Sequence, residues 1–336
     1  MSLSRRALVG SSLVLAAPAI LSSRAARADV RRFNLGYDQP HTTAYGVAAD
    51  IFAAKLEALS KGAMVIDQFP GAQLGQEPQA LQKIRTGDID FIFSATANAA
   101  TLSPQAGVFS IHYLFRNEKH LKNAVTDAAV TAAFRDMLAS TVQGARMVTW
   151  FTLGLRSLYG KKEVHSLADV KGLKIRVQAT ATEDAMFPAY GAQTVHMPFG
   201  NVYTSLQTGV VDMAENGVSI YQLNKHYEVA PVMSLTEHEA NCNMMWVSDK
   251  VWNSLNDEQR GWVMAAGNEV AATEPDKAFK MEHDAVGKLQ KLGVQFVLNV
   301  DKSGFLKVAE PLQDKLAGDL GPHAAKLLTL VRGVSG

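Results

Sequence analysis

The chain has 336 residues, of which 47% are hydrophobic and 19% charged, enough for a globular protein with two separate cores. The formal net charge is +1, and without the four arginines of residues 1–28 there are 29 basic residues against 32 acidic ones, a net charge near −3. Because no basic stripe then remains, the composition argues against binding to nucleic acid or to a membrane surface.

Residues 1–28 have the features of an export signal. A charged start is followed by an apolar run over Ala7–Leu21 and by Ala26-Arg27-Ala28, an A-x-A cleavage pattern. The run is too short for a membrane span, and Ser4-Arg5-Arg6-Ala7 resembles a twin-arginine signal. We therefore expect a mature chain that begins at Asp29 in the periplasm, exported by the twin-arginine or the general secretory route.

The next segment predicts alternating strands and helices. Strand Arg31–Tyr37 is followed by a loop with Asp38 and His41, then by a helix to about Ser60 and by strand Met64–Phe69. In open α/β sheets, ligands bind at the carboxyl ends of strands. Asp38 and His41 are therefore candidate ligand residues, although a histidine in a loop is more often without such a role.

One short phrase occurs twice in the chain. Thr86-Gly87-Asp88-Ile89-Asp90 and Thr208-Gly209-Val210-Val211-Asp212 share the pattern T-G-x-x-D, with a glycine suited to the left-handed cap of a helix before a strand. Thr96 follows the first of these strands and is a candidate ligand residue, because its hydroxyl can donate or accept a hydrogen bond, and Glu215-Asn216 follows the second. The repeat predicts two similar α/β lobes whose strand ends face each other across a cleft; chance similarity is the alternative.

Between the two copies lie a predicted hinge and a candidate anion ligand. Strand Arg146–Phe151 continues to Arg156, and Gly154 within it tolerates backbone changes that other residues resist. In strand Leu173–Val177, alternation separates Arg176 from the apolar face. A guanidinium held on a strand can donate two parallel hydrogen bonds to a carboxylate. A solvated strand arginine is an equally good interpretation of this spacing alone.

Two helices and the cysteine complete the pattern. One helix is predicted from Asn117 to about Leu138. A capping signature at Asn256 begins a long helix that Pro275 should kink or interrupt. Cys242 is the only cysteine, so no internal disulfide can form, and its neighbours indicate a small buried thiol.

The sequence carries no motif for catalysis or for a cofactor. It contains no G-x-S-x-G, H-E-x-x-H or Walker A motif, and no G-x-G-x-x-G after a strand. Glu237-His238-Glu239 comes nearest to a metal cluster, but side chains alternate faces on an extended segment and should not converge on one ion. We expect neither a metal nor a cofactor.

Several motifs together resemble a known family. Gly71-Ala72-Gln73-Leu74-Gly75, the segment Ala168–Val177 and the segment Tyr203–Asn216 are similar, in this order, to solute-binding proteins of TRAP (tripartite ATP-independent periplasmic) transporters, the DctP-like family. The resemblance covers essentially all of the mature chain. It implies an α/β fold of two lobes with a cleft between them and hinge strands. One lobe would comprise residues 29–153 and about 242–280, the other 154–241 and about 281–336.

The resemblance also implies a function and a site. The protein would be a monomeric receptor, not an enzyme, that binds a small carboxylate and delivers it to the TRAP membrane permease subunits. Arg176 and Asn216 match the family's ligand contacts, Arg156 matches a second cation, and Phe199 matches an aromatic residue beside the ligand. For Phe199, a place in the core is the alternative.

Ligand specificity is left open. Sialic-acid binders of the family carry an acidic residue where this chain has Ala95. With Trp150, Phe199 and Trp246 expected nearby, the pocket should favour a flatter or less hydroxylated acid; small keto, hydroxy and aromatic acids fit as well as sugar acids. A dicarboxylate would need another cation. A periplasmic enzyme acting on an organic acid and a ligand-sensing protein for a signalling receptor are the alternative functions.

Overall fold

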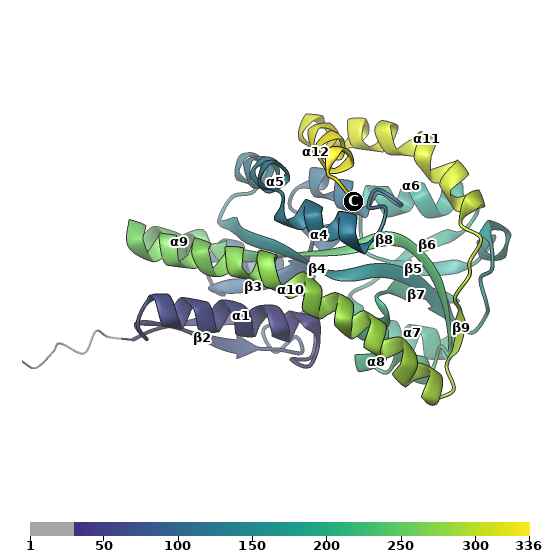
Figure 1. Ribbon diagram of the computed structural model, residues 1–336, viewed down its shortest axis with the longest axis horizontal. Coiled ribbons are helices and arrows are strands. Elements are labelled where there is room, and N and C mark those ends of the chain that lie inside the picture. The colour runs from purple at the N-terminus through teal and green to yellow at the C-terminus, as the bar shows by residue number, and fades with distance from the viewer. Residues whose placement is uncertain (1–29) are drawn as a thin grey trace, which may run out of the picture.

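The computed structural model describes residues 30–336, so the expected leader and the cleavage site before Asp29 lie outside the described residues. A nine-stranded sheet runs through the molecule with helices on both faces (Figure 1). Its strand order is β2-β1-β3-β8-β4-β7-β5-β6, and β9 pairs with β8. The strands are β1 (Arg31–Gly36), β2 (Met64–Phe69), β3 (Phe91–Ala95), β4 (Ala145–Gly160), β5 (Lys174–Val177), β6 (Gln193–His196), β7 (Met213–Asn216), β8 (Val232–Ser248) and β9 (Gln295–Val297).

Helices occupy most of the connections between these strands. They are α1 (Ala44–Leu59), α2 (Glu77–Thr86), α3 (Thr96–Ala99), α4 (Glu118–Thr126), α5 (Ala128–Thr141), α6 (Ala181–Ala189), α7 (Val202–Thr208), α8 (Val218–Leu223), α9 (Asp249–Ser254), α10 (Asp257–Lys291), α11 (Ser303–Leu320) and α12 (Pro322–Gly333). Short 3-10 turns lie at Pro104–Ser110, Leu167–Val170, Phe199–Asn201 and His226–Glu228.

The strand order is nearly symmetric about the central pair β8-β4. On one side β1 is parallel to β2 and β3, and on the other β5 is parallel to β6 and β7. The innermost strand on each side, β3 or β7, follows a helix that ends in a left-handed glycine, Gly87 at φ 75° or Gly209 at φ 76°. This arrangement confirms the two similar α/β lobes predicted from the repeat, joined here in one continuous sheet.

The long antiparallel strands β4 and β8 connect the two lobes. Their register shifts between Thr152 and Leu155, where Gly154 has a φ of 98°. A Cβ at Gly154 would lie 2.8 Å from Cγ of Glu282. Both the backbone conformation and the available space therefore require glycine at the position where the sequence predicted a hinge.

Helix α10 lies across both lobes, and the expectation that Pro275 interrupts it is wrong. The helix is continuous from Asp257 to Lys291, and it begins with the predicted capping box of Asn256 and Gln259. It packs on α1 and β4 and then on α8 (Figure 1). Proline inside a helix costs about 3 kcal/mol, and the buried face along the whole of α10 offsets that cost.

The single helix predicted from Asn117 to Leu138 is two helices. Asp127 separates them, because its Oδ1 accepts hydrogen bonds from the amides of Ala129 and Val130 at 2.8 and 2.9 Å and thereby begins α5. Asn117 begins α4 in the same way by accepting a hydrogen bond from the amide of His120 at 2.9 Å. The side-chain cap at Asp127 thus replaces the continuous helical hydrogen-bond ladder.

Apolar side chains form cores on both faces of the sheet. One cluster joins α1 and β1–β3 to the first half of α10, and a second joins α7, α8 and β7 to its second half. The opposite face is covered by α4, α5, α6, α11 and α12. Because α12 packs on α5, the end of the chain contacts the first lobe, and the lobe boundaries given above stay a prediction.

Candidate ligand-binding site

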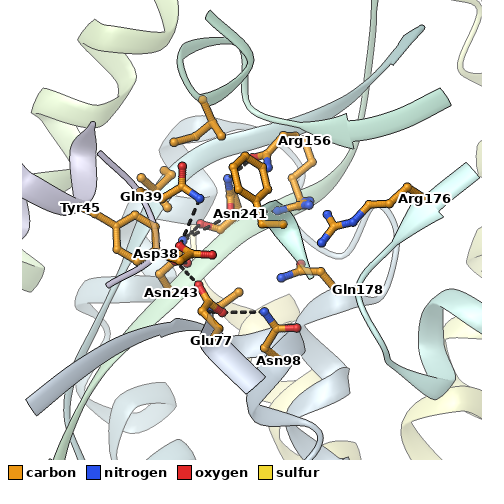
Figure 2. Close-up of a pocket in the computed structure, with 15 residues that line it drawn as sticks. Asp38, Gln39, Tyr45, Glu77, Asn98, Arg156, Arg176, Gln178, Asn241 and Asn243 are labelled. Carbon is orange, nitrogen blue, oxygen red and sulfur yellow. Dashed lines mark hydrogen bonds between the residues drawn. The ribbon is translucent and has the colours of Figure 1, made fainter. Parts of the chain in front are cut away.

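A cavity lies where the carboxyl ends of β1, β3, β5 and β7 meet the central strands (Figure 2). Both lobes contribute side chains to it, as expected for a ligand site in an open α/β sheet. Its polar lining consists of Asp38, Gln39, Tyr45, Glu77, Asn98, Arg156, Arg176, Gln178, Asn216, Asn241 and Asn243. The cavity therefore brings together five predicted site residues: Asp38, Arg156, Arg176, Phe199 and Asn216.

Arg156 on β4 is held by two carboxylates behind it. Its Nε and Nη2 both donate to Glu215, Nη2 at 2.6 Å to Oε1, and its Nε lies 3.2 Å from Oε2 of Glu239. Nη1 donates to Oδ1 of Asn241 at 3.1 Å. Burial by itself would lower the pKa of Arg156, but Glu215 and Glu239 raise it, so the guanidinium stays charged.

Arg176 on β5 points into the cavity beside Arg156 (Figure 2). Its Nε and Nη2 donate to the carbonyl of Met197 at 3.2 and 2.9 Å, and its Nη1 lies 3.8 Å from Oε1 of Glu215. Burial lowers the pKa of Arg176, and the charge of Arg156 acts in the same direction. Since Nε is engaged, a carboxylate can be held only end-on, by Nη1 and the second hydrogen of Nη2.

Two acidic side chains occupy the side of the cavity opposite the arginines (Figure 2). Glu77 is fixed in place, because its carboxylate accepts hydrogen bonds from Tyr45 at 2.9 Å, the amide of Ala95 at 2.9 Å and Asn98 at 2.6 Å. Asp38 accepts a hydrogen bond from Gln39 at 3.1 Å. Burial and the nearby Glu77 raise the pKa of Asp38, and burial raises that of Glu77.

A chain of amides links the acidic side to the basic side. The Tyr45 hydroxyl lies 2.5 Å from Oδ1 of Asn243 as well as 2.9 Å from Glu77, so its single proton can be donated to only one of the two at a time. Nδ2 of Asn243 donates to the carbonyl of Asn241 at 2.8 Å. Nδ2 of Asn241 in turn donates to Oδ1 of Asn216 at 2.8 Å. Oδ1 of Asn216 also accepts a hydrogen bond from the amide of Gly217 at 2.9 Å. The NH2 group of Asn216 is therefore the part of this side chain that can donate to a ligand.

Phe199 forms an apolar wall of the cavity and is only partly buried. Its ring stacks on the ring of His226, with 5.2 Å between the centroids, and the guanidinium of Arg176 lies 6.0 Å from the Phe199 centroid. Burial and Arg176 lower the pKa of His226 to about 4, so this imidazole is neutral. Phe199 thus helps to orient Arg176 and leaves part of its ring to a ligand.

The structure does not bring the other predicted site residues to the cavity. His41 begins the turn before α1, and its Nε2 lies 3.1 Å from Asp50 on the surface. Thr96 is buried and donates to a main-chain carbonyl of β8 at 3.2 Å. Trp150 and Trp246 are fully buried in the core, because β4 directs Trp150 toward α5 instead of toward the cavity. We therefore withdraw His41, Thr96 and Trp150 from the candidate site.

The expectation that Glu237, His238 and Glu239 cannot converge is wrong for two of them. A nitrogen of His238 and carboxylate oxygens of Glu239 and Glu215 lie within 4.8 Å of one another. The cause is Glu237, whose left-handed φ of 46° breaks the alternation of the strand. Arg156 supplies a positive charge beside these carboxylates.

The sequence analysis did not predict several of the polar residues that line the cavity. Asn241 and Asn243 are two apart in the otherwise apolar stretch Ala240–Val247 of β8, so both point to one face, and this signal was available. Glu77 and Tyr45 had no such signal, because the predicted turn and helix alone do not reveal that they meet. Cys242 between the asparagines is buried, as predicted, and burial raises the pKa of its thiol.

Several known proteins are similar to this chain in sequence and fold. Residues 35–319 match the family described as bacterial extracellular solute-binding protein, family 7 (DctP). The chain is 29% identical to a solute-binding protein of Chromohalobacter salexigens over 84% of both chains, and 26% identical to the 2,3-diketo-L-gulonate-binding periplasmic protein YiaO of Escherichia coli over 95% of this chain and 96% of that one. A TRAP periplasmic solute-binding protein of Xanthobacter autotrophicus with bound β-D-galacturonate superposes with a TM-score of 0.83 at 27% identity, over 90% of this chain and 100% of the other.

Within residues 30–336, every helix is too short or too polar to cross a membrane. The family match extends over most of the chain, and the related structure has the same fold over its full length. The chain therefore belongs to the DctP family of TRAP transporter solute-binding proteins.

Proposed function

We propose that this protein captures an organic anion in the periplasm through Arg156, Arg176 and Asn216, and delivers it as a monomer to a TRAP permease. The observation that carries the proposal is the polarity of the cavity, which has two buried guanidinium groups on one side and two acidic side chains on the other. The arginines would hold the ligand carboxylate. Closure of the lobes about Gly154 would then exclude water and strengthen these charged contacts.

The acidic side favours a polyhydroxylated monocarboxylate, such as a uronate or an aldonate. Asp38 and Glu77 can accept hydrogen bonds from ligand hydroxyls, and Asn98 and Gln178 beside them are further partners. Glu77 supplies the acidic group that Ala95 lacks, so the expectation of a less hydroxylated acid loses its support. The related structure with bound β-D-galacturonate and the 2,3-diketo-L-gulonate-binding relative agree with this class of ligand.

Dicarboxylates and aromatic acids fit this cavity less well. A second carboxylate about 5 Å from an ionised Asp38 would cost about 3 kcal/mol at an effective dielectric constant of about 20, which is about two orders of magnitude in Kd. An aromatic ring would offer no hydrogen-bond donor to the remaining acceptor positions of Asp38 and Glu77 and would exclude water from them, a loss of about 1–3 kcal/mol for each group left unsatisfied.

Calorimetry with a panel of acids tests the proposal. We expect D-galacturonate or D-glucuronate to bind to the mature protein at least tenfold more tightly than galactarate, succinate, benzoate or pyruvate. Native mass spectrometry of the freshly purified protein should show a co-purified acid of the same class. A clear preference for succinate or benzoate would contradict the ligand class, and the absence of binding to every acid would contradict the receptor function. Turnover of the bound acid would instead indicate an enzyme.

A further inference from the structure

A second group of ionisable side chains lies behind the arginine pair, outside the cavity lining. It combines residues from α6, β7, β8 and the segment before α4, and each of its side chains is almost fully buried. The members are His112, Glu183, Glu215, His238 and Glu239, with relative exposures of 0, 1, 1, 2 and 4%. Three carboxyl groups thus share the one guanidinium of Arg156, with Arg176 the next cation.

The three carboxyl groups have different partners. Glu215 holds Arg156 with both oxygens, and Oε2 of Glu239 is 3.2 Å from the same guanidinium. Neither oxygen of Glu183 has a hydrogen-bond partner, and Nε2 of His112 lies 3.4 Å from Oε2 without hydrogen-bond geometry. The carboxyl groups of Glu183 and Glu239 both interact with Arg156, and they also interact with each other. Two carboxyl groups can form a hydrogen bond only when one of them carries a proton.

The histidines do not supply the missing positive charge. Burial lowers the pKa of His112 to about 4, and burial together with His112 places the pKa of His238 well below its usual value. Both imidazoles are therefore neutral at physiological pH. Nδ1 of His112 lies 3.1 Å from the Tyr190 hydroxyl, and Nδ1 of His238 lies 2.8 Å from the hydroxyl of Thr236, so these contacts tie both rings to neutral partners.

We propose that Glu183 and Glu239 form a proton-binding site behind the arginine pair, and that an anion binds tightly in the cavity only while this site holds its proton. With the proton in place, the negative charges of Glu215 and of the pair of Glu183 and Glu239 only balance those of Arg156 and Arg176, so the arginines can still attract the ligand carboxylate. When the proton leaves, a third buried negative charge competes with the ligand for Arg156. Anion binding and proton binding then favour each other by linkage.

The direction of the pKa shifts supports this site. Burial and Glu215 raise the pKa of Glu183 to about 8, and burial and Glu183 raise that of Glu239 further above its usual range. Arg156 opposes the rise in the pKa of both groups. The position of Glu183 in the first turn of α6 also opposes the rise in its own pKa, whereas Asp184 adds to it. The proton is therefore held at pH 7 and lost above about pH 8, unless a bound anion raises the pKa again.

The inference rests on the proposed function, and calorimetry with D-galacturonate as the probe tests it. We expect the affinity of the wild type to be nearly constant below pH 7 and to fall about tenfold between pH 7 and pH 9.5, since one linked proton changes Kd by at most tenfold for each pH unit. Titration at pH 9.5 in buffers of different protonation enthalpy should show net proton uptake when the ligand binds. Equal affinity at both pH values, or no proton uptake, would overturn the proposal.

The variant Glu183→Gln assigns the proton, because Asp38 and Glu77 in the cavity also titrate. A glutamine mimics the protonated carboxyl group, so the variant should bind D-galacturonate about tenfold more tightly than the wild type at pH 9.5 and equally well at pH 7. Damage to the fold cannot produce such a gain. The matched control is Glu274→Gln, which changes a buried carboxyl group of α10 with a raised pKa outside the cluster and should keep the wild-type profile. A profile that is unchanged in Glu183→Gln, or flattened equally in both variants, would refute the site.

A readout without ligand separates this inference from the proposed function. If D-galacturonate fails to bind, the ligand class is wrong, and the same titrations apply to whichever acid of the panel does bind. If no acid binds, infrared spectroscopy of the free protein decides: the C=O band of protonated carboxyl groups at pH 7 should weaken in Glu183→Gln and, in the wild type, as the pH rises through about 8. An identical band in wild type and variant would refute the proton site.

Discussion

Replacement of each cavity arginine by methionine should show that Arg156 supports the fold as well as the ligand, whereas Arg176 serves mainly the ligand. Arg156 is paired at close range with Glu215 and Glu239, so Arg156→Met leaves two buried carboxyl groups without their nearest cation. Breaking a buried pair in this way costs about 3–5 kcal/mol. With an unfolding entropy of about 2.1 cal/mol/K per residue, a chain of this size should lose about 5–8 °C in Tm.

Arg176→Met should behave differently, because Arg176 donates to a carbonyl group and its carboxylate partner is 3.8 Å away. Burial already disfavours its charge. We therefore expect the free energy of unfolding to change by less than about 1 kcal/mol, while binding of D-galacturonate weakens by about 2–5 kcal/mol, since the ligand carboxylate loses its partner.

Thermal unfolding of the ligand-free proteins by circular dichroism, together with calorimetry, measures both effects. The loss of stability in Arg156→Met should be smaller at pH 5 than at pH 8, because the carboxyl groups left behind take up protons as the pH falls. Equal destabilisation by the two substitutions, or a retained affinity in Arg176→Met, would refute the division of roles between the arginines.

Three further changes test other parts of the structure. Asp38→Asn should narrow the preference for D-galacturonate over galactarate by up to about 100-fold in calorimetric Kd ratios at high pH, because burial and Glu77 raise the pKa of Asp38 and only its ionised form repels a second carboxylate; an unchanged ratio at high pH would show that Asp38 does not face the ligand. Gly154→Ala should lower the free energy of unfolding in urea by about 1–3 kcal/mol, since it meets both a φ of 98° and Glu282, and a stabilised variant would contradict that reasoning. Cys242 should react with a thiol reagent only after unfolding, because it is 2% exposed and burial raises its pKa; rapid labelling of the native protein would contradict its burial.

Local sequence patterns predicted the frame of the site well. Both T-G-x-x-D junctions end helices at left-handed glycines, as predicted, because this backbone conformation depends on the identity of a single residue. The same holds for Gly154, for the capping box of Asn256 and for the positions of Arg156 and Arg176 on strands. The errors concern residues whose surroundings outweigh local preference, such as Pro275 in the buried helix α10.

The sequence by itself determined the fold class and the repeated lobes, because strand alternation and helix caps depend on neighbours in the chain, whereas the two cavity arginines were predicted through the resemblance to a known family. Only the tertiary structure decided which groups face those arginines. Glu77 meets Tyr45 across 32 positions, and Arg156 meets Glu215 across 59. Such contacts depend on how strands and helices that are distant in the chain pack together, and burial then changes the pKa values of the groups that meet, which no local pattern records.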